Sequence, residues 1–474
     1  MEKYPQGVQT AGTDAATEAA LYEIRKKIYP RSVSGKFDHW RVALVWFTQL
    51  AFYGGPWLTW NDRQAVLFDL AARKFYIFGI VFWPQDFILL AVLLVIAALS
   101  LFLFTAVAGR LFCGYACPQT VYTEIFLWVE HWIEGDRPRR MKLDNEPWGA
   151  RKLAVKAAKH GVWIAIGLWT GFTFVGYFTP IKTLAAEVMS LGLGPWEMFW
   201  ILFYGFATYG NAGWMREQVC KYMCPYARFQ SVMFDSDTLI VTYDYNRGEP
   251  NGARSKSTDY KAAGLGDCVS CSICVQVCPT GIDIRNGLQY ECIGCGLCID
   301  GCNQVMEKMD YPQGLIRYST ENAMNGKYPD KKILARIFRP RVIVYTVIVW
   351  SIIFALGAAV LLRSPLKVNV IRDRVNLVRE TPDGLIENVY RLRIMNTEET
   401  THRYRISASG IDSLRLVSEP QPVEVSGASS RILDVRLQAE PKAVKSGSNR
   451  MMFHIEAIDD SGVKVNEKSS FLAR

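Results

Sequence analysis

Cysteine and tryptophan are missing from the final part of this 474-residue sequence. The twelve cysteines all fall between Cys113 and Cys302, and the fourteen tryptophans between Trp40 and Trp350, so the last 112 residues contain neither. The first 38 residues lack the apolar run of a secretory signal peptide, which predicts that no leader is removed. Half of all residues are hydrophobic, a content that excludes a disordered chain. This uneven distribution predicts at least two environments and about three structural units along the chain.

Five segments are apolar and long enough to be transmembrane helices. The clearest are 87–108 and 342–362, and three more, 40–60, 160–179 and 195–213, carry additional aromatic and polar residues. A helix of about 20 residues crosses the roughly 30 Å hydrocarbon core of a bilayer. Any one segment could instead be a buried core helix, but five in one chain favour a transmembrane α-helical bundle of five spans.

The basic residues predict how these spans are oriented. The loop 109–159 contains nine lysines and arginines, whereas 180–194 has only Lys182. Because cytoplasmic loops are enriched in Lys and Arg, we expect the N-terminus and the 109–159 loop to be cytoplasmic and the C-terminal end to be periplasmic, in a multi-pass protein of the bacterial inner membrane. This placement of the basic loops on the cytoplasmic face of the lipid bilayer accounts for much of the formal charge of +9, and we expect no nucleic-acid partner.

This topology divides the chain into five parts. They are a cytoplasmic tail (1–38), a four-helix transmembrane region (39–213), a cytoplasmic cysteine-rich domain (214–341, core 260–310), a fifth transmembrane helix (342–362) and a periplasmic domain (363–474). The segment 66–83 is apolar but contains Asp69, Arg73 and Lys74, and we expect it to be an interfacial helix on the outer face. If it crossed the membrane, the basic loop would lie outside.

Eight cysteines form the two-cluster signature of bacterial ferredoxins. The first run is Cys268-x2-Cys271-x2-Cys274-x3-Cys278-Pro279, and the second is Cys292-x2-Cys295-x2-Cys298-x3-Cys302. Three cysteines at this spacing wrap around three corners of a cubane, while the fourth leaves the loop and reaches the other cluster. The spacing therefore assigns one [4Fe-4S] cluster to Cys268, Cys271, Cys274 and Cys302, and the other to Cys278, Cys292, Cys295 and Cys298. Small residues allow the backbone to approach the clusters: Ser270, Ser272, Gly294 and Gly296.

A zinc site or a set of disulfides fits these eight cysteines less well. Paired C-x2-C elements can bind zinc, but a run with Pro279 after its fourth cysteine fits a ferredoxin better. Disulfides are disfavoured because the predicted topology places this segment in the reducing cytoplasm. Asn303 stands where a second proline is expected, a departure that leaves all the cysteines in place.

The remaining four cysteines form an internal repeat. Cys113-Gly-Tyr-Ala-Cys117-Pro118 and Cys220-Lys-Tyr-Met-Cys224-Pro225 share the pattern C-x-Y-x-C-P, and each follows the cytoplasmic end of a predicted span. A spacing of four puts both sulfurs of a pair on one face of a helical turn, and the prolines start new elements. If the two halves pack as a pseudo-symmetric pair, the four thiols converge beside the membrane.

Such a group of thiols can bind a metal, act as a redox dithiol or simply pack. Thiolates select Cu(I), zinc or iron–sulfur clusters, whereas buried thiols without a ligand behave as small hydrophobic side chains. Nearby cations are expected to lower the thiol pKa: Arg110, Arg216, Lys221 and Arg228. The duplication of the motif at equivalent positions favours a metal-binding or redox role.

The last domain has the pattern of a β-sandwich. Apolar and polar residues alternate in stretches such as Val389-Tyr-Arg-Leu-Arg-Ile394, separated by turn signals such as Pro382-Asp-Gly384. About seven to nine short strands in roughly 110 residues are typical of an Ig-like fold. The Cys…Trp…Cys core of antibody domains is absent, and so is any catalytic constellation. We therefore expect a docking or scaffolding role.

Together these features resemble one known family. Five spans, two C-x-x-x-C-P motifs, a two-cluster ferredoxin and a C-terminal Ig-like domain are similar to the CcoG family, also called FixG or RdxA, over essentially the whole chain. The stretch Gly109-Arg-Leu-Phe-Cys-Gly-Tyr-Ala-Cys-Pro118 also resembles the membrane ferredoxins NapH and NosR. The resemblance implies an accessory protein for assembly of cbb3-type cytochrome c oxidase, which reduces Cu(II) to Cu(I) for a copper-exporting P-type ATPase.

By that resemblance, Cys113, Cys117, Cys220 and Cys224 would bind or reduce copper, and the two cubanes would carry electrons from a cytoplasmic donor. The expected activity is that of a cupric reductase or electron-transfer oxidoreductase, and a homodimer is compatible with it. Two alternatives stay open. One is a NapH-like subunit that passes electrons between quinone and a partner, and the other is a non-catalytic scaffold for oxidase assembly.

Overall fold

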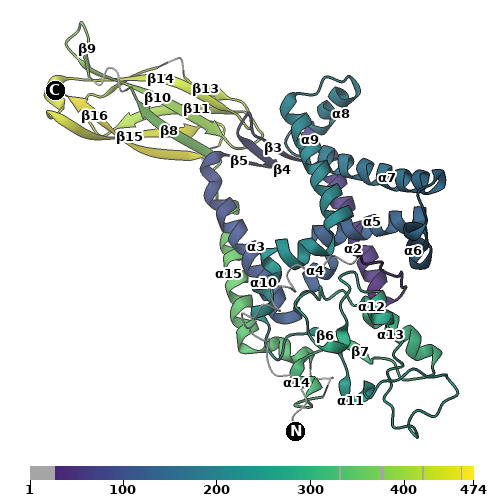
Figure 1. The fold of residues 1–474 in the computed structure, drawn as a ribbon. Helices are drawn as coiled ribbons and strands as arrows, with labels where there is room; N and C mark the ends of the chain where they lie inside the picture. Colours follow the sequence, from purple (N-terminus) through teal and green to yellow (C-terminus); the bar gives the residue numbers. More distant parts are fainter. Residues whose placement is uncertain (1–26, 330–332, 374–377, 419–420, 461, 474) are drawn as a thin grey trace, which may run out of the picture. The chain divides into compact units, whose positions relative to one another are not determined.

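The computed structural model describes residues 27–329, 333–373, 378–418, 421–460 and 462–473 (Figure 1). The chain divides into two compact units, each assembled from separate stretches of sequence. The first comprises Met1–Val45, Phe104–Trp163 and Tyr209–Ile337, and the second Trp46–Leu103, Ile164–Thr208 and Phe338–Arg474. Residues 1–26 of the predicted cytoplasmic tail lie outside the described residues.

The first unit contains all twelve cysteines. Two strands, β6 (Ile240–Tyr243) and β7 (Ile316–Ser319), pair antiparallel and bring together the two ends of the ferredoxin-like segment. The α-helices that belong wholly or partly to this unit are α2 (Lys36–Gly54), the end of α3 (Phe87–Ala108), α4 (Leu111–Tyr115), α5 (Pro118–Glu134), α6 (Arg137–Asn145), α7 (Ala150–Val175), α10 (Pro225–Met233), α11 (Tyr245–Gly248), α12 (Ile273–Gln276), α13 (Leu297–Lys308) and α14 (Glu321–Met324).

The start of α2 is held by the ferredoxin-like segment. The buried carboxylate of Asp300, in α13, accepts hydrogen bonds from the N–H groups of Phe37 (3.0 Å) and Asp38 (2.9 Å) in the first turn of α2. A carboxylate at this position satisfies free N–H groups and interacts favourably with the helix dipole. One turn further on, buried Arg41 pairs with Glu124 of α5 at 2.7 Å. These contacts fix where the chain enters α2.

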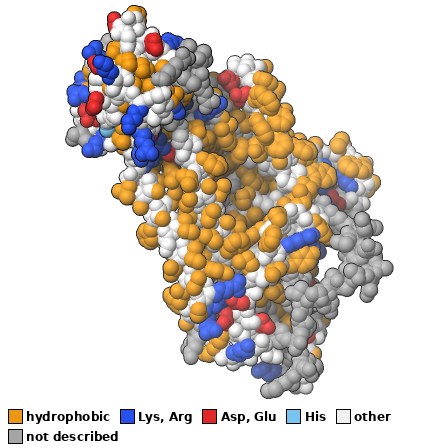
Figure 2. Space-filling view, turned by 90° about the vertical axis from the view of Figure 1, so that its left-hand side faces the viewer, with side chains coloured by type: hydrophobic (Ala, Val, Ile, Leu, Met, Phe, Trp, Pro, Cys, Tyr) orange, Lys and Arg blue, Asp and Glu red, His pale blue; other side chains and the backbone are white. Residues whose placement is uncertain are grey.

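The second unit contains most of one very apolar helix and the whole of another. α3 (Phe87–Ala108) and α15 (Pro340–Leu361) run side by side in Figure 1, and side chains of both line one cavity. Many of their large apolar side chains are exposed, such as Leu94 (64%) and Phe354 (69%), and Figure 2 shows hydrophobic side chains gathered over a wide area of this face. An exposed apolar surface of this extent is typical of a membrane or partner surface.

Two helices among the described residues are long and apolar enough to cross a membrane, Pro84–Ala108 and Pro340–Leu361. They coincide with the predicted spans 87–108 and 342–362. The other three predicted spans are helical over different bounds. α2 ends at Gly54, α7 begins ten residues before position 160, and α9 (Pro195–Thr208) continues as a π-helical turn, Tyr209–Met215. The five-span bundle therefore stays a prediction.

The prediction of an interfacial helix at 66–83 is wrong. This segment is a three-stranded antiparallel sheet of β3 (Val66–Asp69), β4 (Lys74–Ile77) and β5 (Ile80–Phe82). Arg73 and Phe78 adopt positive φ values of 55° and 51° in the two turns. Apolar stretches rich in β-branched and aromatic residues suit strands as well as helices. The first turn contains no glycine, and Gly79 in the second turn is the residue that could have marked it.

The C-terminal part is a β-sandwich, as predicted. One sheet has the order β12-β14-β10-β8, with β9 paired to β10, and the other has the order β13-β11-β15-β16. Their inward residues form a continuous core that includes fully buried Tyr390, Tyr404, Phe453 and Phe471. The strands are β8 (Leu366–Arg372), β9 (Arg379–Glu380), β10 (Ile386–Asn396), β11 (His402–Ser409), β12 (Arg415–Val417), β13 (Val423–Val425), β14 (Ser430–Ala439), β15 (Gly447–Ala457) and β16 (Lys464–Ala473).

A buried ion-pair group joins the sandwich to the apolar helices within the second unit. Asp86, directly before α3, pairs with Arg363 at 3.0 Å and with Lys367 of β8. Val81 and Trp83, at the end of the small sheet, pack against Met395 of β10. The remaining elements of this unit are the paired strands β1 (Thr59–Trp60) and β2 (Arg63–Gln64) and helix α8 (Ile181–Met189).

Candidate iron-sulfur and thiol sites

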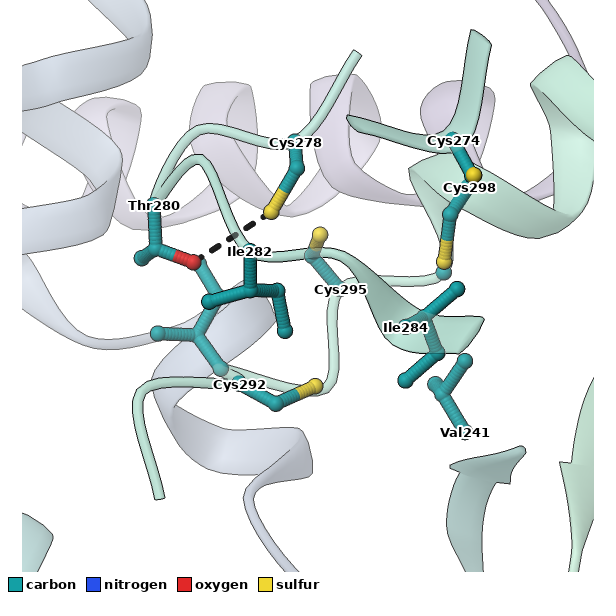
Figure 3. A pocket seen from close by; sticks show the side chains of 11 residues that line it. Val241, Cys274, Cys278, Thr280, Ile282, Ile284, Cys292, Cys295 and Cys298 are labelled. Atoms are coloured by element: carbon teal, nitrogen blue, oxygen red, sulfur yellow. Dashed lines mark hydrogen bonds between the residues drawn. The ribbon is translucent and has the colours of Figure 1, made fainter. Parts of the chain in front are cut away.

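The eight cysteines of the ferredoxin pattern lie around two adjacent cavities. The first cysteine cavity is lined by Cys268, Cys271, Cys274 and Cys302. The second cysteine cavity is lined by Cys278, Cys292, Cys295 and Cys298, and Cys274 also reaches it (Figure 3). The structure thus brings together the same two sets of four that the spacing predicts. Because Cys274 lines both cavities, the two sets are immediate neighbours.

Left-handed backbone residues turn each cysteine loop. Ser270, Ser272, Gly294 and Gly296 have φ values of 52°, 56°, 63° and 77°. This region is open to glycine and costs other residues about 1–2 kcal/mol. Helices α12 and α13 begin directly after Ser272 and Gly296. The fourth cysteine of each run then lies just beyond α12 or within α13, where it faces the other loop's cavity.

Both cavities have apolar walls and buried thiols. Val241, Ile282 and Ile284 line the second, where Cys278 Sγ lies 3.3 Å from the hydroxyl of Thr280 (Figure 3). Burial raises the pKa of Cys274 and Cys302 to about 12 and that of Cys295 to about 11. Buried thiols of this kind lose their protons when a cationic group binds them.

The donor set fits one [4Fe-4S] cluster in each cavity. Four thiols in apolar surroundings are what such clusters require, and the first and second cysteine cavities each supply four. A bound cluster supplies one-electron redox chemistry. The first cavity is the more accessible, because Cys271 is the exposed member of the eight. Arg285 lies beside that cavity and opposes the rise in the pKa of Cys274, which burial dominates.

The other four cysteines, Cys113, Cys117, Cys220 and Cys224, also lie together, and we refer to them as the four-thiol group. The pKa of Cys113 is raised to about 11 by burial and further by Cys117 and Cys224. The pKa of Cys220 is raised to about 12 by burial and by the other three thiols. Gln230, in the helix α10 that begins directly after Cys224, has its Oε1 3.6 Å from Cys113 Sγ, so the two C-x-Y-x-C-P motifs are neighbours in space.

The expectation that each pair of sulfurs shares one face of a helical turn is wrong. Cys113 lies in α4, but Cys117 is the extended N-cap residue of α5. Cys220 lies in a second π-helical turn, Val219–Met223, and Cys224 is the extended N-cap residue of α10. The physical reason is that proline disfavours a helical conformation in the residue before it. The two prolines do begin new helices, as expected.

Arg110 is the buried cation beside the four-thiol group. Its Nε donates to Gln230 Oε1 at 2.9 Å, and its guanidinium also donates to the carbonyl oxygen of Tyr290. The same Gln230 oxygen lies 3.6 Å from Cys113 Sγ. Burial raises the pKa of Cys113, Cys117 and Cys220, and Arg110 only partly opposes it.

The expectation of lowered thiol pKa values is therefore wrong for Cys113, Cys117 and Cys220. One of the cations that we expected to act on them, Arg216, pairs with Glu130 at 2.6 Å instead. Desolvation of a thiolate in a buried site outweighs the positive charge of Arg110. Without a bound cation, Cys113, Cys117 and Cys220 are neutral thiols at neutral pH.

Gln230 is a residue beside the four-thiol group that sequence reasoning missed. Its side chain is fully buried, and its Nε2 donates to the hydroxyl of Tyr226 (2.8 Å) and to the carbonyl oxygen of Gly109 (3.1 Å). One side-chain amide thus positions Arg110 and reaches Cys113 from a different helix, α10. No motif or spacing in the sequence marks this residue.

Helix α4 packs directly on the loop of the second cysteine cavity. The backbone of Gly114 approaches that of Ile293 and Cys295 so closely that a Cβ at position 114 would overlap them. Cys113, Ile293, Cys295 and Leu297 belong to one buried apolar cluster. The four-thiol group and the second cavity are therefore neighbours. The glycine between Cys113 and Tyr115 was the one sequence feature that could have indicated this approach.

A site for a single metal ion requires several ligand side chains that converge on one point. Among the residues that the structure describes, no three His, Cys, Asp or Glu side chains converge closely enough to hold one ion. Copper binding by the four-thiol group stays a prediction, as does the role of the other eight cysteines as individual ligands.

The fold and these sites define an iron–sulfur electron-transfer protein with a C-terminal Ig-like domain. A family model described as a 4Fe-4S dicluster domain matches residues 215–321, and one described as a 4Fe-4S binding domain matches 90–140. A third, for the Ig-like fold at the C-terminus of FixG, matches 356–474.

The chain belongs to the FixG/RdxA family, which confirms the resemblance seen in the sequence. It is 41% identical over 413 residues to the nitrogen fixation protein FixG of Rhizobium meliloti, covering 81% of this chain and 79% of that relative. It is 42% identical over 406 residues to the protein RdxA of Cereibacter sphaeroides, covering 83% and 85%. The protein RdxB of the same organism is 40% identical over 415 residues, covering 86% and 87%.

Proposed function

We propose that this protein transfers electrons from a cytoplasmic donor to Cu(II) and releases Cu(I) for the assembly of cbb3-type cytochrome c oxidase. The observation that supports the proposal is the contiguity of the three cysteine groups. The two cysteine cavities share Cys274, and the second touches the four-thiol group where Gly114 meets Cys295. Each Cu(II) takes up one electron, and the donor loses one.

The first cysteine cavity is the entry point in this proposal. Cys271 is exposed there, so a soluble donor can approach this cavity, whereas Cys113 of the four-thiol group is buried. The second cavity lies between the two, next to α4. The packing therefore supports one order of transfer: donor, first cavity, second cavity, four-thiol group.

The four-thiol group supplies ligands that suit the product. Thiolates are soft donors and favour Cu(I) over Cu(II), so coordination there assists reduction. Because burial keeps Cys113 and Cys220 protonated in the absence of a cation, copper binding releases protons. Arg110 offsets part of the negative charge that the thiolates then bring together.

The membrane arrangement is part of the same proposal. Five spans place the N-terminus and all cysteine groups in the cytoplasm and the Ig-like domain in the periplasm. The exposed apolar faces of α3 and α15 and the nine basic residues of 109–159 support it. In this arrangement the Ig-like domain docks a copper-exporting P-type ATPase or oxidase assembly factors, or a second copy of the chain.

Reduction of Cu(II) by the purified, anaerobically pre-reduced protein tests the proposal, with a Cu(I)-specific chelator as the readout. The double variant C113S/C224S is expected to lose reduction while keeping the iron content of the wild type. The variant C271S is also expected to lose reduction, but because it loses the cluster of the first cavity, so it should contain about half of the iron of the wild type. Full reduction by C113S/C224S with its iron intact would refute the role of the four-thiol group.

A second candidate function concerns the same four thiols. The 4Fe-4S binding model covers residues 90–140, which contain Cys113 and Cys117 but none of the eight ferredoxin-pattern cysteines. This match favours a third cluster at the four-thiol group, from which electrons would pass to a membrane partner such as quinone. Iron analysis separates the two candidates, with about eight iron atoms per chain for two clusters and about twelve for three.

A further inference from the structure

A cavity of about 460 Å³ lies in the first unit and shares no residue with the two cysteine cavities. It is enclosed by α5, α6, the first turns of α7, residues 213–217 and the chain at Lys27 and Ile28. Three tryptophans form its walls, Trp148, Trp163 and Trp214. The electron-transfer function proposed above makes no use of this cavity.

The lining contains five cations and three carboxylates, and a fourth carboxylate, Glu134, pairs with Lys156 and Lys159 from outside it. The cations are Lys27, Lys152, Lys156, Lys159 and Arg216, and the carboxylates are Glu130, Asp144 and Glu217. Two of these carboxylates are each shared between cations. Glu130 pairs with Arg216 at 2.6 Å and, from outside the lining, with Arg140 at 2.9 Å. Asp144 pairs with Lys27 and Lys156, both at 2.6 Å.

Lys152 is a buried cation that pairs with no carboxylate among the described residues. It is 7% exposed, and its Nζ donates to the carbonyl oxygens of Asp144 (2.8 Å) and Glu146 (2.6 Å). The ring of Trp148 lies 5.0 Å away. These contacts orient the ammonium group and partly compensate its charge, because both carbonyls lie at the C-terminal end of α6, but they supply no counter-ion, and an ammonium has a third N–H to donate. Because a buried charge without a counter-ion is costly, the site calls for an anion.

We propose that this cavity binds the phosphate headgroup of an anionic phospholipid. Two of its tryptophans are largely exposed, Trp148 at 76% and Trp214 at 55%, as is typical of side chains at the headgroup level of a bilayer. Helix α7 carries the basic residues of the cavity in its first turns and then continues as the apolar stretch 160–175. Basic pockets at the cytoplasmic ends of membrane helices bind such headgroups.

The choice of a lipid over a soluble phosphate follows from the same features. Both offer a phosphate anion to Lys152, but only the lipid brings acyl chains and a glycerol backbone to the exposed tryptophans. The inference rests on the proposed membrane placement of α7 and not on copper reduction. Lipid binding is therefore measured on its own, alongside iron content and Cu(II) reduction.

The experiment is native mass spectrometry of the full-length holoprotein in a neutral detergent, titrated with phosphatidylglycerol, phosphatidylcholine or inorganic phosphate. Phosphatidylglycerol is expected to bind and the other two are not. The variant K152Q should weaken this binding by about tenfold to a hundredfold, as expected for the loss of one charge-assisted hydrogen bond, and K152R should restore most of it. K182Q, on α8, is the matched control and should bind as the wild type does.

Each other outcome overturns the proposal. Equal binding of phosphatidylcholine would show that no anion is recognised, and competition by inorganic phosphate would assign the cavity to a soluble anion. Because K152Q could also disturb folding, K27Q at the half-exposed rim is measured in parallel and should weaken binding as well. Unchanged phosphatidylglycerol binding in both variants, with iron content intact, would refute the site. A failure of the wild-type protein to reduce Cu(II) would refute the copper proposal and would not affect the conclusion on phosphatidylglycerol binding.

Discussion

Replacing Gly114 by alanine tests the contact between α4 and the second cysteine cavity. A Cβ at position 114 would lie 2.8 Å from the carbonyl oxygen of Ile293, 2.9 Å from Cα of Cys295 and 3.0 Å from its backbone nitrogen. Carbon atoms are normally separated by about 3.5–4 Å. All three neighbours are backbone atoms, so no side chain can rotate away to make room.

The size of the effect follows from this geometry. The loop of Ile293 and Cys295 must move by about 0.5–1 Å to restore normal contacts, and overpacking of this kind costs about 1–3 kcal/mol. Alanine is a better helix former than glycine by about 1 kcal/mol, which offsets part of that cost. The displaced loop carries Cys292 and Cys295, so the disturbance falls on the second cavity and leaves the cysteines of the first in place.

The assay is iron and sulfide analysis with electron paramagnetic resonance on anaerobically purified protein. We expect G114A to lose the second cluster, with about four iron atoms per chain in place of about eight, and to lose Cu(II) reduction. The control is G161A in α7, where a Cβ would meet no atom within 4 Å and stability should be unchanged or slightly higher. Wild-type iron content and reduction in G114A would refute the close packing that supports the proposed order of transfer.

Three further predictions concern single residues. Q230L should lower the free energy of unfolding by about 1–3 kcal/mol, because Arg110 Nε loses its buried acceptor; thermal unfolding measures it, and Q230E should lose less. R110Q should lower the reduction potential of the metal centre bound at the four-thiol group, because the positive charge of Arg110 stabilises its reduced, more negative state. A redox titration measures this potential, and R110K should restore it. An unchanged potential in R110Q would contradict the prediction. Burial raises the pKa of Asp237, but hydrogen bonds from Arg336 and other donors outweigh it and hold that pKa at about 2, below its ordinary 3.8. The contribution of the ionised Asp237 to stability is therefore complete above about pH 4 and lost as the pH falls through 2. In acid unfolding, D237N should lack this loss of stability between pH 4 and pH 2. An acid-unfolding curve of D237N identical to that of the wild type would count against the ion pair.

Short-range patterns account for what could be predicted from the sequence. The grouping of Cys302 with the first run, and of Cys278 with the second, follows from spacings of three and four residues, and the structure forms the same groups. The strands of the sandwich follow from strict alternation, because each side chain of a strand faces either the core or the solvent. The family resemblance follows from the order of these local motifs along the chain.

Two predictions failed where a local pattern suits more than one structure. The apolar segment 66–83 has residues that favour strands and helices alike. Its first turn, at Arg73, has no glycine or proline, and Gly79 alone marks the second. The four-residue spacing of Cys113 and Cys117 suits one helical turn, but the following proline makes the second cysteine extended.

The sequence by itself therefore determined the iron–sulfur class, the two sets of four cysteines and the sandwich, because each depends on residues a few positions apart. Only the tertiary structure decided that Gly114 touches Cys295, that Gln230 holds Arg110 beside Cys113, and that Lys152 is buried without a carboxylate partner. The first two contacts join residues more than a hundred positions apart, and the third depends on how α6 and α7 fold over one side chain. Packing of distant segments selects such contacts, and no local spacing encodes them.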